Sequence, residues 1–87
     1  MPDQHSLSDP SFDEALDCLG LRCPLPVLKA RKALQRLRPS MVLLVQASDP
    51  MAVVDVPHMA REEGHTVLHQ SVEGDNSAFW IRRESSP

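Results

Sequence analysis

A helix with clear sequence signals at both ends limits the fold of this chain more than any other feature. Residues 24–37 carry apolar side chains at spacings of three and four, the pattern of a helix that buries one face. Pro24 suits the first helical position, and Pro39 ends the helix because the residue before a proline avoids helical geometry. We therefore predict a helix over residues 24–37, whose buried stripe is Val27, Ala30, Ala33, Leu34 and Leu37.

Strand patterns lie on both sides of this helix. Residues 14–19 form a strand that ends at a turn around Gly20. Residues 41–47 are apolar and β-branched, as in a strand that is buried on both faces and central in its sheet.

The second half of the chain begins with another helical region. Asp49 and Pro50 are an N-cap and a first-turn proline. We expect Pro57 to interrupt this region, and a short helix to resume and reach Glu63, with Gly64 as its C-cap.

Two further strands complete the pattern. They are predicted at residues 66–72 and 77–83, on either side of a hairpin signal at residues 73–76. The order is βαβαββ, and right-handed crossovers place both helices on one face of the sheet. We therefore predict an α/β two-layer sandwich with a mixed four-stranded sheet and two helices on one face.

The length of 87 residues fits a single domain. We expect that domain over residues 12–84. The flanking segments, residues 1–11 and 85–87, are polar and contain proline, so we predict disordered tails there.

The composition also bears on the cellular location. The longest apolar run, residues 41–45, is far too short to cross a bilayer, and the first residues lack the basic region and apolar core of an export signal. Two cysteines are too few for a disulfide framework, and a reducing compartment suits a free thiol. We expect a cytoplasmic protein without membrane association.

Cys23 is the candidate reactive residue because it stands directly before the predicted helix. A sulfur at the N-cap lies at the positive end of the helix dipole, which stabilises the thiolate and lowers the pKa of the thiol toward neutrality. Pro26 has no backbone N–H, so the Leu25 amide is the obvious local donor to the sulfur. We predict an exposed, lightly held and partly ionised thiol.

Basic residues are concentrated on the same helix. Six of the nine Lys and Arg residues and none of the twelve acids lie in residues 22–38, although the net charge is −3. The side chains opposite the buried stripe are either an ordinary solvated face or a docking surface for an acidic partner. The candidate partner-binding residues are Arg22, Leu25, Lys29, Lys32 and Arg36.

The segment over residues 16–34, with the sequence LDCLGLRCPLPVLKARKAL, resembles the TusA/SirA-like family of small sulfur-carrier proteins, or sulfurtransferases. The resemblance continues through Ser48-Asp49-Pro50, Asp55-Val56-Pro57 and Gly64-His65, and covers roughly residues 13–83. It implies a βαβαββ fold and a persulfide carried on the cysteine before Pro-x-Pro, here Cys23. Gly20, Pro24 and Pro26 then form the motif around the helix start.

The resemblance also implies partners. In that family a cysteine desulfurase supplies the sulfur, which passes to a downstream acceptor in tRNA 2-thiolation, molybdenum-cofactor synthesis or sulfur oxidation. Exchange between sulfur atoms needs an accessible nucleophile more than an acid–base apparatus, which agrees with the features of Cys23. We expect a sulfurtransferase-type persulfide carrier that acts as a monomer without a cofactor.

Cys18 has two interpretations. It is either a small buried strand residue, as free cysteines often are, or a resolving thiol for Cys23. The spacing Cys-x4-Cys is not the Cys-x-x-Cys of thioredoxin-like motifs, and no second cysteine pair supplies zinc ligands.

Other polar residues have ordinary structural explanations. His58, His65 and His69 show no ligand spacing, so we predict no metal site. Asp49 and Asp55 precede predicted helical starts, and we interpret both as capping residues without a chemical role.

Two other functions remain open. A segment with six positive charges at and around the predicted helix suits a nucleic-acid-binding module, but the net charge is negative and the only aromatics for base stacking are Phe12, Phe79 and Trp80. We therefore regard direct nucleic-acid binding as the weaker interpretation. The second alternative is a thiol-redox regulatory module based on a disulfide between Cys18 and Cys23.

Overall fold

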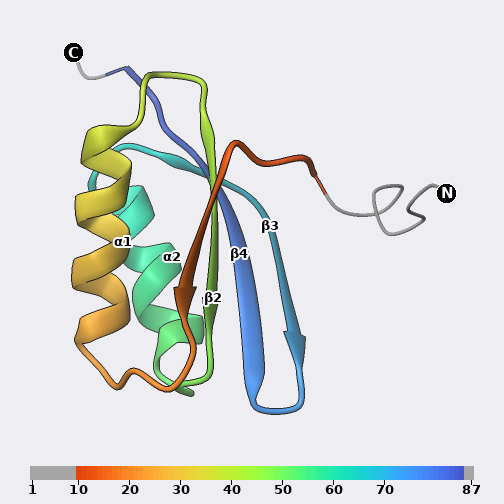
Figure 1. Ribbon diagram of the computed structural model, residues 1–87. Coiled ribbons are helices and arrows are strands. Elements are labelled where there is room, and N and C mark those ends of the chain that lie inside the picture. The colour runs from red at the N-terminus through yellow and green to blue at the C-terminus, as the bar shows by residue number, and fades with distance from the viewer. Residues whose placement is uncertain (1–9, 86–87) are drawn as a thin grey trace, which may run out of the picture.

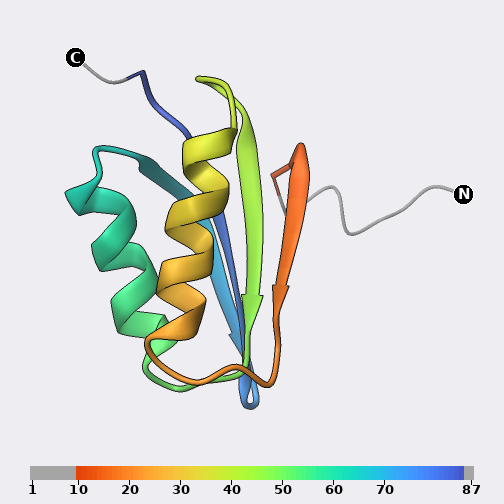
Figure 2. The same ribbon diagram turned by 60° about the vertical axis from the view of Figure 1, so that its left-hand side comes forward.

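The chain folds into one mixed sheet with two helices on one face (Figures 1 and 2). The computed structural model describes residues 10–85. The observed order βαβαββ confirms the predicted fold class. The elements are β1 (Glu14–Cys18), α1 (Leu25–Arg36), β2 (Val42–Ala47), α2 (Ala52–Glu62), β3 (Thr66–Glu73) and β4 (Asn76–Arg82).

The strand order in the sheet is β1-β2-β4-β3. β1 and β2 are parallel, whereas β4 is antiparallel to both of its neighbours, β2 and β3. Cys18 at the end of β1 pairs with Ala47 at the end of β2. The carboxyl ends of these two strands therefore meet at the same edge of the sheet, and the loops that lead to the two helices begin there.

The core lies between the helices and the sheet. Phe79, Leu43, Ile81 and Val45 are fully buried, and they belong to the two central strands. The predicted stripe of α1 is confirmed, with four of its residues buried and Val27 partly buried against the core. Pro26 is also buried, although the stripe did not include it.

The second helix differs from the prediction. α2 begins later, at Ala52, and continues through Pro57 without interruption. A proline inside a helix removes one backbone hydrogen bond, but Ala52, Val56 and Ala60 repeat at a spacing of four and are all buried. Packing of this face against the core keeps the helix continuous, because tertiary contacts supply most helical stability in proteins.

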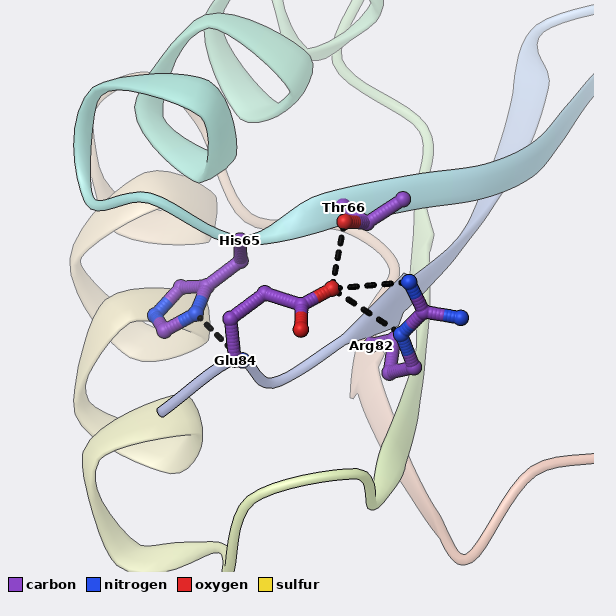
Figure 3. Close-up of polar contacts among 4 residues, drawn as sticks. All are labelled: His65, Thr66, Arg82 and Glu84. Carbon is purple, nitrogen blue, oxygen red and sulfur yellow. Dashed lines mark hydrogen bonds and ion pairs between the residues drawn. The ribbon is translucent and has the colours of Figure 1, made fainter. Parts of the chain in front are cut away.

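A polar cluster lies at the end of the sheet where β3 begins and β4 ends, opposite the carboxyl ends of β1 and β2 (Figure 3). The Glu84 carboxylate accepts hydrogen bonds from the Thr66 hydroxyl and from Nε of Arg82, the latter at 2.9 Å. The Glu84 N–H donates to Nδ1 of His65 over 3.1 Å. These contacts fasten the chain after β4 to the start of β3.

Neither helix described here is long and apolar enough to cross a membrane. Of the two predicted tails, only residues 10, 11 and 85 are described; residues 1–9 and 86–87 lie outside the described part of the chain.

Candidate functional site

The candidate site forms where two loops meet at the carboxyl ends of β1 and β2. Residues 19–24 lead from β1 to α1, and residues 48–51 lead from β2 to α2; both loops lie at the bottom of Figures 1 and 2. The Gly20 N–H donates to Oγ of Ser48 over 2.8 Å, and the Cys23 N–H donates to Oδ2 of Asp49. The second loop therefore holds the backbone of the first at two points, Gly20 and Cys23.

A hollow of about 420 Å³ lies between the two loops, lined by Gly20, Leu21, Arg22, Ser48, Asp49 and Pro50. Gly20 adopts a φ of +83°, in the left-handed region that suits glycine. A Cβ at this position would have no atom within 4 Å, so the requirement for glycine is conformational and not steric. The Leu21 N–H closes the turn by donating to the Cys18 carbonyl over 3.2 Å.

The start of α1 differs in detail from the prediction. The N-cap is Pro24 and not Cys23, and the first helical residue is Leu25. The Leu25 N–H donates to the Arg22 carbonyl over 2.8 Å, so this amide bonds to backbone and not to the sulfur. Cys23 therefore lies one residue before the cap.

The Cys23 side chain is exposed, as predicted, but its partner was not foreseen. Its Sγ donates a hydrogen bond to Oδ2 of Asp55 over 3.4 Å. This hydrogen bond raises the pKa of Cys23, and desolvation and the charges of Asp55 and Asp49 act in the same direction. The predicted lowering of the pKa is wrong, because it considered only the dipole of α1 and not the carboxylates that α2 and its preceding loop bring to the sulfur. The hydrogen bond and the two carboxylates therefore favour the thiol over the thiolate at Cys23.

The prediction that Asp49 and Asp55 cap helical starts is wrong, because the N-cap of α2 is Met51 and this cap makes no side-chain hydrogen bond. Oδ1 of Asp49 accepts the Met51 N–H over 3.1 Å, which supports the turn before α2, while Oδ2 holds the Cys23 backbone. Asp55 lies inside the first turn of α2 and caps nothing there. The signal that was missed is topological: loops that follow adjacent parallel strands meet at one edge, so residues after β2 reach residues after β1.

Cys18 is fully buried in the core at the end of β1. Burial raises the pKa of its thiol. Both cysteines are free thiols. A small packing residue is expected to have this environment. A resolving role for Cys18 stays a prediction, and it would require the end of β1 to open so that the buried thiol could reach Cys23.

The basic side of α1 is exposed, as predicted. Its apolar member, Leu25, keeps 45% of its surface accessible. Arg36 lies 3.8 Å from a carboxylate oxygen of Glu14, and Arg31 lies 3.6 Å from one of Glu63. Part of the positive charge of the helix is therefore balanced within the chain itself.

The three histidines within residues 10–85 lie apart in different surroundings. His58 contacts Glu62 over 3.4 Å on the exposed side of α2, His65 belongs to the cluster at the far end of the sheet, and His69 packs edge-on against Trp80 with ring centroids 5.1 Å apart. Among residues 10–85, no group of three or more His, Cys, Asp or Glu side chains is arranged to hold a metal ion.

Comparison with known proteins gives concordant matches. Residues 14–83 match the family described as Sulfurtransferase TusA. The chain is 38% identical over 71 residues to the putative sulfur carrier protein YrkI of Bacillus subtilis, covering 82% of this chain and 95% of the relative. It is 39% identical over 72 residues to the sulfur carrier protein TusA of Allochromatium vinosum, covering 83% and 95%.

The fold also matches a solved structure. The crystal structure of the SirA-like protein from Desulfitobacterium hafniense covers 84% of this chain and 100% of its own, with a TM-score of 0.73 and 24% sequence identity. At this identity the similarity concerns the fold alone.

Proposed function

The chain belongs to the TusA sulfurtransferase family, and on that premise we propose that Cys23 accepts a persulfide sulfur from a cysteine desulfurase-type donor and passes it to a downstream acceptor. The observation that carries this proposal is the exposed Cys23 thiol on a loop whose backbone is held by Asp49. An accessible sulfur on an anchored loop suits entry into the sites of other proteins.

The chemistry needs no cofactor and no net oxidation. The Cys23 sulfur attacks the terminal sulfur of the donor's persulfide, so that a sulfur–sulfur bond forms at Cys23 while the donor's sulfur–sulfur bond breaks. The proton lost by Cys23 is matched by one taken up at the donor's released thiolate. Delivery to the acceptor repeats the exchange in the opposite sense and regenerates the free thiol.

The proposed docking surface surrounds this thiol and continues along α1. Leu25 offers an exposed apolar contact close to Cys23. Beyond it, the exposed cations suit a partner with acidic residues. The residues of this surface are Arg22, Leu25, Lys29, Lys32 and Arg36.

The receiving pathway is proposed to be tRNA 2-thiolation, molybdenum-cofactor synthesis or another sulfur-trafficking route in the cytoplasm. The carrier is proposed to act as a monomer, because a monomer leaves the Cys23 loop accessible to successive partners.

Loading with sulfur tests the proposal. The purified chain is incubated with a cysteine desulfurase and cysteine, and its intact mass is measured. We expect a gain of one sulfur atom that a reducing thiol removes, no gain in Cys23→Ser, and a full gain in the matched control Cys18→Ser. Equal loading of Cys23→Ser would show that another residue carries the sulfur.

The alternative functions have their own readouts. Tight RNA binding that weakens steeply with salt and persists in Cys23→Ser would favour a nucleic-acid-binding module. A Cys18–Cys23 disulfide trapped at a cytosolic redox potential, without any sulfur uptake, would favour a redox module.

A further inference from the structure

The hydrogen bond from the Cys23 sulfur to Asp55 favours the protonated, less reactive form of this exposed thiol, which is unexpected for a sulfur nucleophile. We propose that Asp55 holds the unloaded Cys23 as a hydrogen-bonded thiol, and that a basic side chain of the partner protein pairs with Asp55 and frees the thiolate only in the docked complex. This inference rests on the proposed carrier function and concerns the regulation of the same site.

The geometry places Asp55 as a direct partner of the reacting atom. Its Oδ2 accepts the Cys23 Sγ–H at 3.4 Å, and the side chain is half-buried in the first turn of α2. Asp49 fixes the Cys23 backbone from the same side and is itself oriented by the Met51 N–H. Both the backbone and the sulfur of Cys23 are therefore tied to the start of α2.

The charges at the sulfur act in one direction. The charges of Asp55 from α2 and Asp49 from the preceding loop both raise the pKa of Cys23, beside the larger effect of the hydrogen bond to Asp55. At Cys18, burial raises the pKa, and the charge of Lys29 from α1 acts there in the opposite direction. The thiolate of Cys23 is thus disfavoured relative to the thiol.

A cation supplied by the partner would reverse the two effects of Asp55 on the thiol, which are its hydrogen bond and its negative charge. A Lys or Arg that pairs with Asp55 takes the hydrogen-bond acceptor away from the thiol and cancels the nearest negative charge. The attraction is stronger in a desolvated interface than in water. The partner then presents acidic groups toward α1 and one basic group toward Asp55, so that correct docking and activation of the thiol become one event.

The arrangement protects the carrier between encounters. The thiolate is the form that oxidants and alkylating agents attack, and an exposed thiolate is vulnerable to both. The proton that leaves Cys23 on docking goes to solvent, and the donor's thiolate takes up an equivalent proton after transfer.

The test measures the rate of iodoacetamide alkylation of Cys23 as a function of pH, with the adduct located by mass spectrometry. The variants are Asp55→Asn, which removes the charge with little change in shape, and Asp55→Lys, which supplies a cation at the same place. Glu62→Gln is the matched control, because it removes one charge from the same helix at an exposed position that contacts His58. Far-UV circular dichroism establishes that each variant is folded.

We expect Asp55→Asn to raise the alkylation rate at pH 7 roughly three- to tenfold, which corresponds to a midpoint lower by about half to one pH unit. Asp55→Lys should lower the midpoint further, and Glu62→Gln should leave it unchanged. An unchanged midpoint in folded Asp55→Asn overturns the inference, as does a midpoint in Asp55→Lys no lower than in wild type.

A second measurement tests the role of the partner. Persulfide loading by a cysteine desulfurase should be slower in Asp55→Asn than in wild type, although the free thiol of the variant is more reactive, because the pairing with the partner's cation is lost. Loading that rises in parallel with alkylation overturns the partner's role. Alkylation does not depend on sulfur transfer, so failure of this inference and failure of the carrier function give different results.

Discussion

Cys23 and Asp55 lie 32 positions apart in the sequence, yet the sulfur of the first donates a hydrogen bond to the carboxylate of the second over 3.4 Å. The loop after β1 supplies the thiol, and the helix after β2 supplies the carboxylate that raises its pKa. The site is therefore shared between two consecutive strand–helix units, and changes in either unit are expected to alter it.

Replacing Asp49 with alanine should loosen the Cys23 loop. The substitution leaves the N–H groups of Cys23 and Met51 without their side-chain acceptor. We expect a loss of about 1–2 kcal/mol in the free energy of unfolding, measured with urea, together with faster hydrogen exchange at the Cys23 amide. Asp49→Asn keeps an acceptor oxygen and should lose less; equal losses in the two variants would contradict this account of the loop.

Replacing Cys18 with alanine should affect stability but not sulfur loading. The side chain is fully buried, so its removal leaves a small cavity and costs about 1 kcal/mol in the free energy of unfolding. The Cys23 thiol lies on the exposed loop and should load with sulfur to the same extent. Loss of loading in a folded Cys18→Ala variant would instead support a resolving role for Cys18.

His65 should make stability depend on pH. Desolvation and the charge of Arg83 lower the pKa of His65, against a smaller opposite effect from Glu63 and Glu84. The unfolded chain therefore binds the proton first as the pH falls below about 6.5. The stabilisation of the folded state by neutral His65 is complete above about pH 6.5. It is lost as the pH falls from there through the lower pKa of the folded state.

Urea unfolding between pH 7.5 and about 5 measures this effect. His65→Asn, which can retain an acceptor for the Glu84 N–H, should weaken the pH dependence in that range. His58 lies on the exposed side of α2, and His58→Gln is the control variant, which should keep the pH dependence of wild type. If the free energy of unfolding of folded His65→Asn changes with pH as in wild type, the pH dependence belongs to other groups.

Reversing charge on the basic side of α1 should weaken docking without altering the thiol. The double variant Lys29→Glu and Lys32→Glu is expected to slow loading by a cysteine desulfurase at low salt, and the difference should shrink as salt screens the interaction. Arg36→Gln, which removes a charge already lying 3.8 Å from Glu14, is expected to have a smaller effect. A salt-independent defect would point to misfolding or to loss of a specific contact.

Much of the architecture could be predicted because the relevant signals are local. The apolar spacing along α1 and the hairpin between β3 and β4 each depend on a short stretch of sequence. Pro57 was misjudged because the intrinsic cost of a proline in a helix is also local, whereas the packing of Ala52, Val56 and Ala60 that outweighs it is not.

The exposure of Cys23 was predicted correctly, and its pKa was not. Exposure follows from a position between a glycine turn and a helix start, which neighbouring residues specify. The direction of the pKa shift depends on a carboxylate from another helix, whose approach requires β1 and β2 to be parallel neighbours.

The sequence by itself determined which segments become strands and helices, and which sulfur is presented at a loop, because periodicity, proline and glycine act within a few residues. Only the tertiary structure decided that α2 continues through Pro57 and that Asp55 meets Cys23, because core packing and electrostatic interactions act between segments that only the folded sheet brings together.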